Sequence, residues 1–182
     1  QGGAVAAMAP ALGLTPDLGI APAKAQAAEP AWRHALSLFG EVRYPAGFKR
    51  FDYVNPDAPK GGTMQLSQPD RRTSFDKFNP YTIKGNSPAA LATLMFESLA
   101  VRSGDEPDTM YGQLAQDIQV APDKSWVAFR LNPKARFTNG DPVTAADVKH
   151  SFDMLTSKEA APGVRTGLAG IAGATVLDAR TI

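Results

Sequence analysis

The amino-acid sequence predicts a mixed α/β fold, and three observations lead to this class. Apolar and polar residues alternate at 63–67 and again at 126–131, which is the pattern of a half-buried strand. From Thr144 onward, apolar residues recur at intervals of three and four, which is the pattern of an amphipathic helix. Turn residues separate these segments and nothing repeats, so we expect helices and strands to combine in one α/β layer.

Residues 1–27 have the composition of a targeting segment rather than of a fold. They are mostly Ala, Gly, Pro and Leu, with Asp17 and Lys24 as charged residues. Ala25 and Ala27 match the A-x-A pattern of a signal-peptidase site, so we interpret 1–27 as the remnant of a signal peptide. We therefore expect a periplasmic protein, and one without a lipid anchor because no Cys follows the predicted site. A disordered Ala/Pro-rich linker is the alternative interpretation.

Residues 28–62 are predicted to form an N-terminal helix followed by an ordered strap. Trp32, Leu36 and Phe39 are at helical spacing before Gly40, which predicts a short amphipathic helix. Turn residues dominate 44–62, so this stretch is expected to be a strap without regular structure. Its expected apolar anchors are Phe48, Phe51 and Tyr53.

Residues 63–96 are predicted to contain a strand at 63–67 and then a helix. Ser87 can cap the free N–H groups of that helix, and Pro88 is tolerated in its first turn. The apolar residues that follow share one helical face: Leu91, Leu94, Met95 and Leu99. An Arg71-Arg72 pair before this helix is interpreted as a surface turn, with contact to an acidic ligand group as the alternative.

Residues 97–182 hold the clearest local signals. We predict a short helix at 109–114, and a hairpin of two strands, 118–120 and 126–131, joined by a turn at 121–125. Asn139-Gly140 predicts a tight turn, because both residues tolerate positive φ. Residues 174–182 are predicted to be a strand, a turn and the start of a second strand. Since strands need partners, we interpret the chain as a fragment of a longer protein.

The helix from Thr144 has the strongest start signal of the chain. Thr144 is the predicted N-cap, and Asp147 three residues later can bond back to the cap N–H. Val143 and Val148 stand at the positions of a hydrophobic staple. Val148, Phe152 and Leu155 then form the expected apolar face.

Composition and motifs exclude several classes of function. The 182 residues carry 19 basic and 18 acidic side chains, a net charge of +1, which does not favour a nucleic-acid partner. The absence of Cys excludes disulfides and thiolate chemistry. His34 and His150 lack metal-site spacing and are interpreted as surface residues, so we expect no metal and no cofactor. Without a G-x-S-x-G elbow, we expect no catalytic residues and no enzyme activity.

Two further polar stretches are interpreted as surface features. Asp105, Glu106 and Asp108 can in principle perform acid–base chemistry, but they flank Gly104 and Pro107, so we expect a solvated turn. Residues 60–63, Lys-Gly-Gly-Thr, are similar to part of a phosphate loop. They lack the upstream glycine and lead into a predicted strand rather than a helix, so we interpret them as a flexible entry to that strand.

Several motifs in order resemble a known family. Residues 126–152 read WVAFRLNPKARFTNGDPVTAADVKHSF, which resembles the signature of family 5 solute-binding proteins, the receptors of ABC importers. Residues 51–62, FDYVNPDAPKGG, and 34–41, HALSLFGE, resemble the Yej-like branch, which accepts oligopeptides and microcins. Residues 78–81, FNPY, are similar to a segment after the family's first strand. The resemblance covers 32–182.

The resemblance implies a two-lobed periplasmic binding protein of type II with an extra subdomain. Residues 63–96 then start lobe I, residues 97–182 form an incomplete extra subdomain, and lobe II is absent from this chain. The expected function is capture of an oligopeptide and its delivery to an inner-membrane ABC permease by a monomeric receptor. The expected substrate-binding residues are Lys84, Gly85, Asn86 and Ser87, with a helix-capping turn as the alternative role of this loop.

Two other functions stay open on the sequence. The same fold can bind a different solute, such as nickel, heme, a sugar or an opine, because fold does not determine ligand. A secreted hydrolase or chaperone-like domain is the alternative from another class. A hydrolase requires a nucleophile, a base and an orienting group in reach of one another, and the sequence shows no such set.

Overall fold

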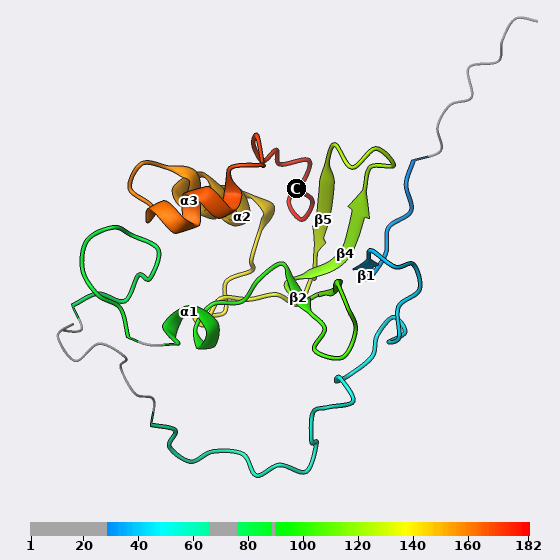
Figure 1. Ribbon diagram of the computed structural model, residues 1–182, viewed down its shortest axis with the longest axis horizontal. Coiled ribbons are helices and arrows are strands. Elements are labelled where there is room, and N and C mark those ends of the chain that lie inside the picture. Colours follow the sequence, from blue (N-terminus) through cyan, green and yellow to red (C-terminus); the bar gives the residue numbers. More distant parts are fainter. Residues whose placement is uncertain (1–28, 66–75, 89) are drawn as a thin grey trace, which may run out of the picture.

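Two small antiparallel sheets and a pair of helices make up most of the regular structure in the computed structural model (Figure 1). The structure describes residues 29–65, 76–88 and 90–182. The elements are β1 (Ala35–Ser37), α1 (Leu91–Leu94), β2 (Ala100–Arg102), β3 (Thr109–Gly112), β4 (Ala115–Val120), β5 (Val127–Leu131), α2 (Ala145–Thr156) and α3 (Pro162–Leu168). The mixed α/β class is therefore confirmed at the level of secondary-structure content.

The first sheet has the strand order β1-β3-β2 and contains Tyr111, the largest fully buried side chain among the described residues. Ala35 and Val101 flank Tyr111 in register, and the Tyr111 side chain has no exposed surface. The predicted helices at 32–39 and 109–114 are both wrong, because these segments pair with each other as β1 and β3. Burial along β3 alternates, with Thr109 and Tyr111 inside and Met110 exposed, which is the strand period of two.

The second sheet is the hairpin β4–β5, and it confirms the predicted strands and turn. Both of its outer edges are occupied, one by Arg33 and the other by the segment that ends the chain. The main-chain N–H of Ile182 donates to the carbonyl of Phe129, and the reverse bond is 2.8 Å long. The turn predicted before this segment is present, since the Leu177 N–H donates to the Thr181 carbonyl at 2.8 Å. Residues 174–177, predicted to be a strand, are irregular.

The strap expected between 44 and 62 is present and is fixed by aromatic contacts. Tyr44, Phe48 and Phe51 surround Tyr111, with ring centroids 5.7, 5.0 and 5.5 Å from it. Tyr53 stacks on Phe51 at 5.2 Å. The predicted anchors are therefore confirmed, and they cover the first sheet on one side.

Three earlier predictions fall wholly or partly outside the described residues. The predicted signal remnant, 1–27, and the Arg71-Arg72 turn lie outside them entirely. Of the predicted strand at 63–67, residues 63–65 are irregular and 66–67 are not among the described residues.

The sequence signals that mark the starts of α2 and α1 differ in strength. Thr144 and Asp147 form the predicted capping box at the start of α2, with the Thr144 N–H donating to the Asp147 carboxylate at 2.8 Å. The Asn139-Gly140 turn is also confirmed, with Gly140 at φ 93°. The helix predicted after Ser87-Pro88 is only one turn long: it starts after Ala90, which has the left-handed conformation, and it ends at Leu94. No helix among the described residues is long and apolar enough to cross a membrane.

Candidate functional site

The predicted binding residues lie in a closed loop, 76–87, whose two ends bond to each other. The main-chain N–H groups of Asp76 and Lys77 donate to the Asn86 carbonyl at 3.0 and 3.3 Å. In return, the Asn86 N–H donates to the Asp76 carboxylate. Figure 1 shows the loop as the green arc beside α2 and α3. Lys84, Gly85, Asn86 and Ser87 are thus held together at the closing end of the loop.

The side chain of Lys77 crosses the inside of this loop. Its ammonium donates to the Thr82 carbonyl at 2.7 Å and to the Thr82 hydroxyl at 3.1 Å. Its alkyl chain runs beneath Gly85, where an added Cβ would lie 3.3 Å from the Lys77 Cδ and 2.5 Å from the Asp76 carboxylate. Gly85 also has φ 85°, which L side chains rarely adopt. The loop therefore requires glycine at this position for two independent reasons.

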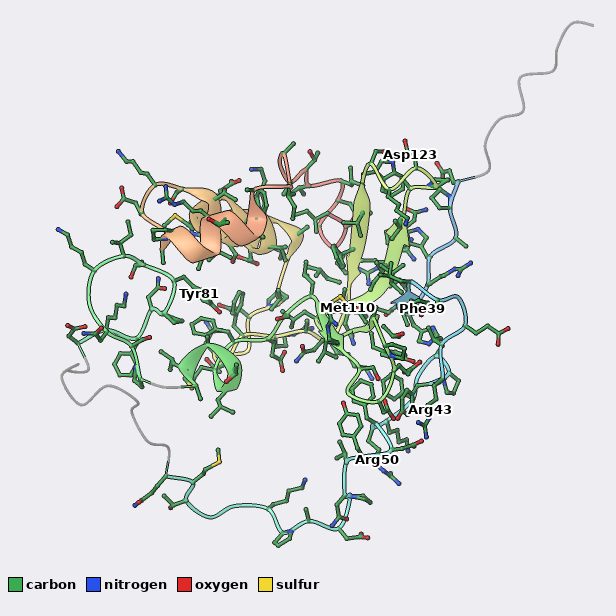
Figure 2. The ribbon with its side chains drawn as sticks, in the orientation of Figure 1. Phe39, Arg43, Arg50, Tyr81, Met110 and Asp123 are labelled. Atoms are coloured by element: carbon green, nitrogen blue, oxygen red, sulfur yellow. The ribbon has the colours of Figure 1, made fainter. Side chains whose placement is uncertain are left out.

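The outer side of the loop is attached to the junction between α2 and α3. The Ala161 N–H donates to the Tyr81 carbonyl at 2.7 Å, and Thr82 pairs with Ala160 as an antiparallel bridge. The Tyr81 ring packs edge-on against Phe96, with centroids 5.5 Å apart. Figure 2 marks Tyr81 on the side of the loop that faces the helices. The helical part of the chain thus provides a platform for the loop.

The predicted residues differ in exposure. Lys84, Gly85 and Asn86 are exposed, and Ser87 is half-buried. The alternative role for Ser87, capping the next helix, is wrong, because α1 begins after Ala90 and has no side-chain cap. An ammonium, an amide and main-chain groups on a closed backbone can bond to a polar ligand such as a peptide main chain.

Sequence reasoning did not find Asp76, Lys77 and Thr82 as the residues that shape this loop. Their contacts depend on chain closure and on docking to Ala160 and Ala161, which no local pattern encodes. The one local signal was a glycine between two polar residues, Lys84 and Asn86.

The acidic turn lies at the surface as predicted, with Asp105 and Asp108 exposed and Glu106 half-buried, and it is also bonded to the strap and to the residue before it. Asp105 accepts hydrogen bonds from the Tyr44 hydroxyl and the Ser103 hydroxyl, and it pairs with Arg43 at 3.1 Å. Glu106 accepts from the Arg43 N–H at 2.7 Å and from the Tyr111 hydroxyl at 2.7 Å. With both carboxylates engaged as acceptors, the turn serves as the attachment point of the strap rather than as an acid–base pair. Figure 2 marks Arg43, the residue directly before the strap.

The hydrogen bonds of this turn set the direction of its pKa shifts. The bond from Tyr44 is the main cause that lowers the pKa of Asp105, with Ser103 and Arg43 acting in the same direction. Burial alone would raise the pKa of Glu106, but the bonds from Arg43, Tyr111 and Ser103 together lower it. Burial raises the pKa of Tyr111 to about 12. All three shifts favour ionised carboxylates and a neutral Tyr111 hydroxyl, which are the forms that these hydrogen bonds require.

The two histidines differ in their surroundings. His34 is half-buried rather than on the surface, and its Nε2 lies 2.9 Å from the Tyr44 carbonyl. His150 is exposed on α2, as predicted. In the part of the chain that the structure describes, no group of three or more His, Asp or Glu side chains could hold a metal ion.

Comparison with known proteins agrees with the resemblance seen in the sequence. Residues 109–182 match the model of the bacterial extracellular solute-binding proteins, family 5 Middle. The chain is 42% identical over 125 residues to the uncharacterized protein YejA of Escherichia coli, covering 69% of this chain and 20% of that protein. It is 36% identical over 151 residues to the probable peptide-binding protein YejA of Agrobacterium fabrum, covering 83% and 24%. A third relative, the peptidoglycan-binding protein YepA of Agrobacterium fabrum, is 36% identical over 165 residues, covering 87% and 26%.

These matches establish the class of the protein. The chain belongs to the bacterial extracellular solute-binding proteins of family 5, within the Yej-like group. It spans about a fifth to a quarter of the length of the curated relatives it matches. The family and the names of the relatives point to a binding role rather than a catalytic one.

Proposed function

We propose that this chain is part of a periplasmic receptor that captures oligopeptides and delivers them to an inner-membrane ABC importer. Family membership supports solute binding, and one relative is named as a probable peptide-binding protein. The closed loop 76–87 is the observation that links the proposed function to particular residues. It presents exposed polar groups of Lys84, Gly85 and Asn86 on a backbone that is bonded at both ends.

The proposed mode of binding uses main-chain contacts from this loop. A peptide always offers the same N–H and C=O groups, whatever its side chains, so contacts to the peptide backbone give broad selectivity. A loop that is already closed loses less conformational entropy on binding than a free one. In the proposed receptor, this loop forms part of the wall of lobe I, and the second lobe closes over the ligand by a hinge.

Thermal unfolding of the full-length mature protein tests the proposal. Peptides that bind only the native state increase the free energy of unfolding by about 2.7 kcal/mol at a hundredfold excess over the dissociation constant, and the melting temperature rises as a result. A rise with a mixture of short peptides is the expected result, and the mixture can then be divided to find the ligand. No rise with peptides, together with a rise with nickel, heme, sugars or opines, would contradict the peptide assignment and leave the family unchanged.

A second ligand class is favoured by one comparison. The Agrobacterium relative named as a peptidoglycan-binding protein matches 87% of this chain. Peptides released from peptidoglycan therefore belong in the same melting assay, beside ordinary peptides of equal length. A larger shift with the cell-wall peptides than with their ordinary counterparts would move the proposal to that ligand.

A further inference from the structure

A half-buried lysine inside the proposed ligand loop is bonded entirely to that loop. The ammonium of Lys77 uses two of its three donors on Thr82, one on the carbonyl and one on the hydroxyl. Its alkyl chain passes beneath Gly85. The side chain therefore connects the start of the loop to Thr82 and supports the segment that carries Lys84, Gly85 and Asn86.

The residue to which Lys77 bonds is also the one that docks the loop. Thr82 pairs with Ala160, and its neighbour Tyr81 accepts from the Ala161 N–H at 2.7 Å. Ala160 is buried, with 3% of its surface exposed. Lys77 thus joins two separate attachments of the loop, the closure at Asp76 and Asn86 and the docking at the α2–α3 junction.

We propose that Lys77 is a positioning residue for peptide binding, which holds Lys84–Asn86 in the conformation that accepts the ligand. The proposal rests on the proposed function of the loop. Lys77 acts through the loop rather than by contact with the peptide. Without its ammonium, the closed form becomes one of several conformations, and the apparent dissociation constant rises in inverse proportion to the fraction that stays closed.

The expected loss of peptide affinity follows from the strength of the hydrogen bonds that the variant loses. Bonds made by a charged donor are stronger than neutral ones, so we expect the closed fraction to fall to about one tenth. Peptide affinity should then fall about tenfold. Replacement by arginine should retain most of the affinity, because a guanidinium can also donate to both oxygen atoms of Thr82.

The experiment compares Lys77→Met and Lys77→Arg with the wild type, in the full-length protein. Lys158→Met is the matched control, because Lys158 is exposed next to the same α2–α3 junction. Calorimetry measures affinity for a peptide taken from the melting assay. Hydrogen exchange of the ligand-free proteins measures opening of residues 78–86. Should Lys77→Met fail to fold, Thr82→Val removes only the hydroxyl acceptor, and its expected loss is about two- to threefold.

The expected result has three parts: faster exchange at 78–86 and about tenfold weaker binding in Lys77→Met, recovery of both in Lys77→Arg, and no change in Lys158→Met. Unchanged exchange in Lys77→Met would overturn the positioning role. Faster exchange with unchanged affinity would overturn it as well, because the loop would then be ordered by Lys77 without serving the ligand. Absence of peptide binding by the wild type would instead refute the proposed function itself, so the two failures are distinct.

Discussion

Substitution of Tyr111 by phenylalanine tests how the strap is held on the first sheet. The change keeps the ring that Tyr44, Phe48 and Phe51 contact and removes only the hydroxyl. That hydroxyl donates to the Glu106 carboxylate at 2.7 Å and accepts from the Tyr44 N–H at 3.1 Å. The variant therefore loses one charge-assisted hydrogen bond and leaves a buried N–H without its acceptor.

The structure allows the size of this effect to be worked out. A bond to a charged group contributes about 1.5–3 kcal/mol, and an unsatisfied buried donor costs about 1–3 kcal/mol, so we expect a loss of about 3 kcal/mol after partial relaxation. Since about 1.4 kcal/mol corresponds to a factor of ten, opening of the strap should become about a hundredfold more frequent.

Native-state hydrogen exchange of the full-length protein measures this opening. Peptides that cover 42–54 and 100–112 should exchange about a hundredfold faster in Tyr111→Phe. Tyr53→Phe is the control, because Tyr53 is 55% exposed and stacks on Phe51 through its ring alone. Exchange in Tyr111→Phe at the wild-type rate would refute the reasoning, since the hydroxyl would then not hold the strap.

The same hydroxyl predicts a response to alkaline pH. The pKa of Tyr111 is raised by burial from 10.0 to about 12. A group whose pKa is raised on folding stabilises the native state below the unfolded pKa, and that contribution disappears as the pH rises through the folded pKa. Wild-type stability should therefore decline between about pH 10 and 12 more steeply than that of Tyr111→Phe, measured as melting temperature against pH.

Three other predictions concern α2, the ligand loop and the acidic turn. Thr144→Ala removes the capping box with Asp147 and should cost about 1 kcal/mol in thermal unfolding, and an unchanged melting temperature would contradict this. Gly85→Ala forces a Cβ against the Asp76 carboxylate at a positive φ, so peptide affinity measured by calorimetry should fall at least about tenfold, whereas equal affinity would exclude the loop from the site. The pKa of Asp105 is lowered in the native state from its ordinary value of 3.8. The carboxylate therefore stabilises the native state above pH 3.8, and this contribution is lost as the pH falls through the pKa of the folded protein. The difference in melting temperature between wild type and Asp105→Asn should therefore shrink below pH 3.8, and a constant difference would argue against the bonded carboxylate.

The features predicted correctly from sequence have short-range causes. The capping box joins Thr144 to a residue three positions away, and Gly140 supplies the positive φ of its own turn. The hairpin β4–β5 has its partners on either side of a short turn, so its two strands are indicated by neighbouring residues. The apolar alternation did not indicate which side chains are buried, because Val127 is exposed and Ala128 is buried. In each case the residues that determine the structure are neighbours in the chain, so the pattern alone is enough.

The features that sequence patterns missed have partners far away in the chain. Residues 32–39 have helical spacing, yet a short isolated helix is marginal, and β1 forms instead because Ala35 finds main-chain partners beside Tyr111. The acidic turn is exposed to solvent as expected, but no local pattern predicted that the hydroxyl groups of Tyr44 and Tyr111, which are 67 positions apart, both donate to it. These outcomes depend on which segments meet, and composition does not encode that.

The proposed ligand loop combines both kinds of cause. The residues Lys84–Ser87 were selected by resemblance, and the positive φ of Gly85 was found only in the structure. Only the tertiary structure showed that the Lys77 side chain bonds across the loop to Thr82. It also showed that the loop pairs with Ala160 and Ala161, about 80 positions further along the chain. Local hydrogen bonds and steric limits can be read from neighbouring residues, whereas docking depends on long-range packing that appears only when the whole chain is folded.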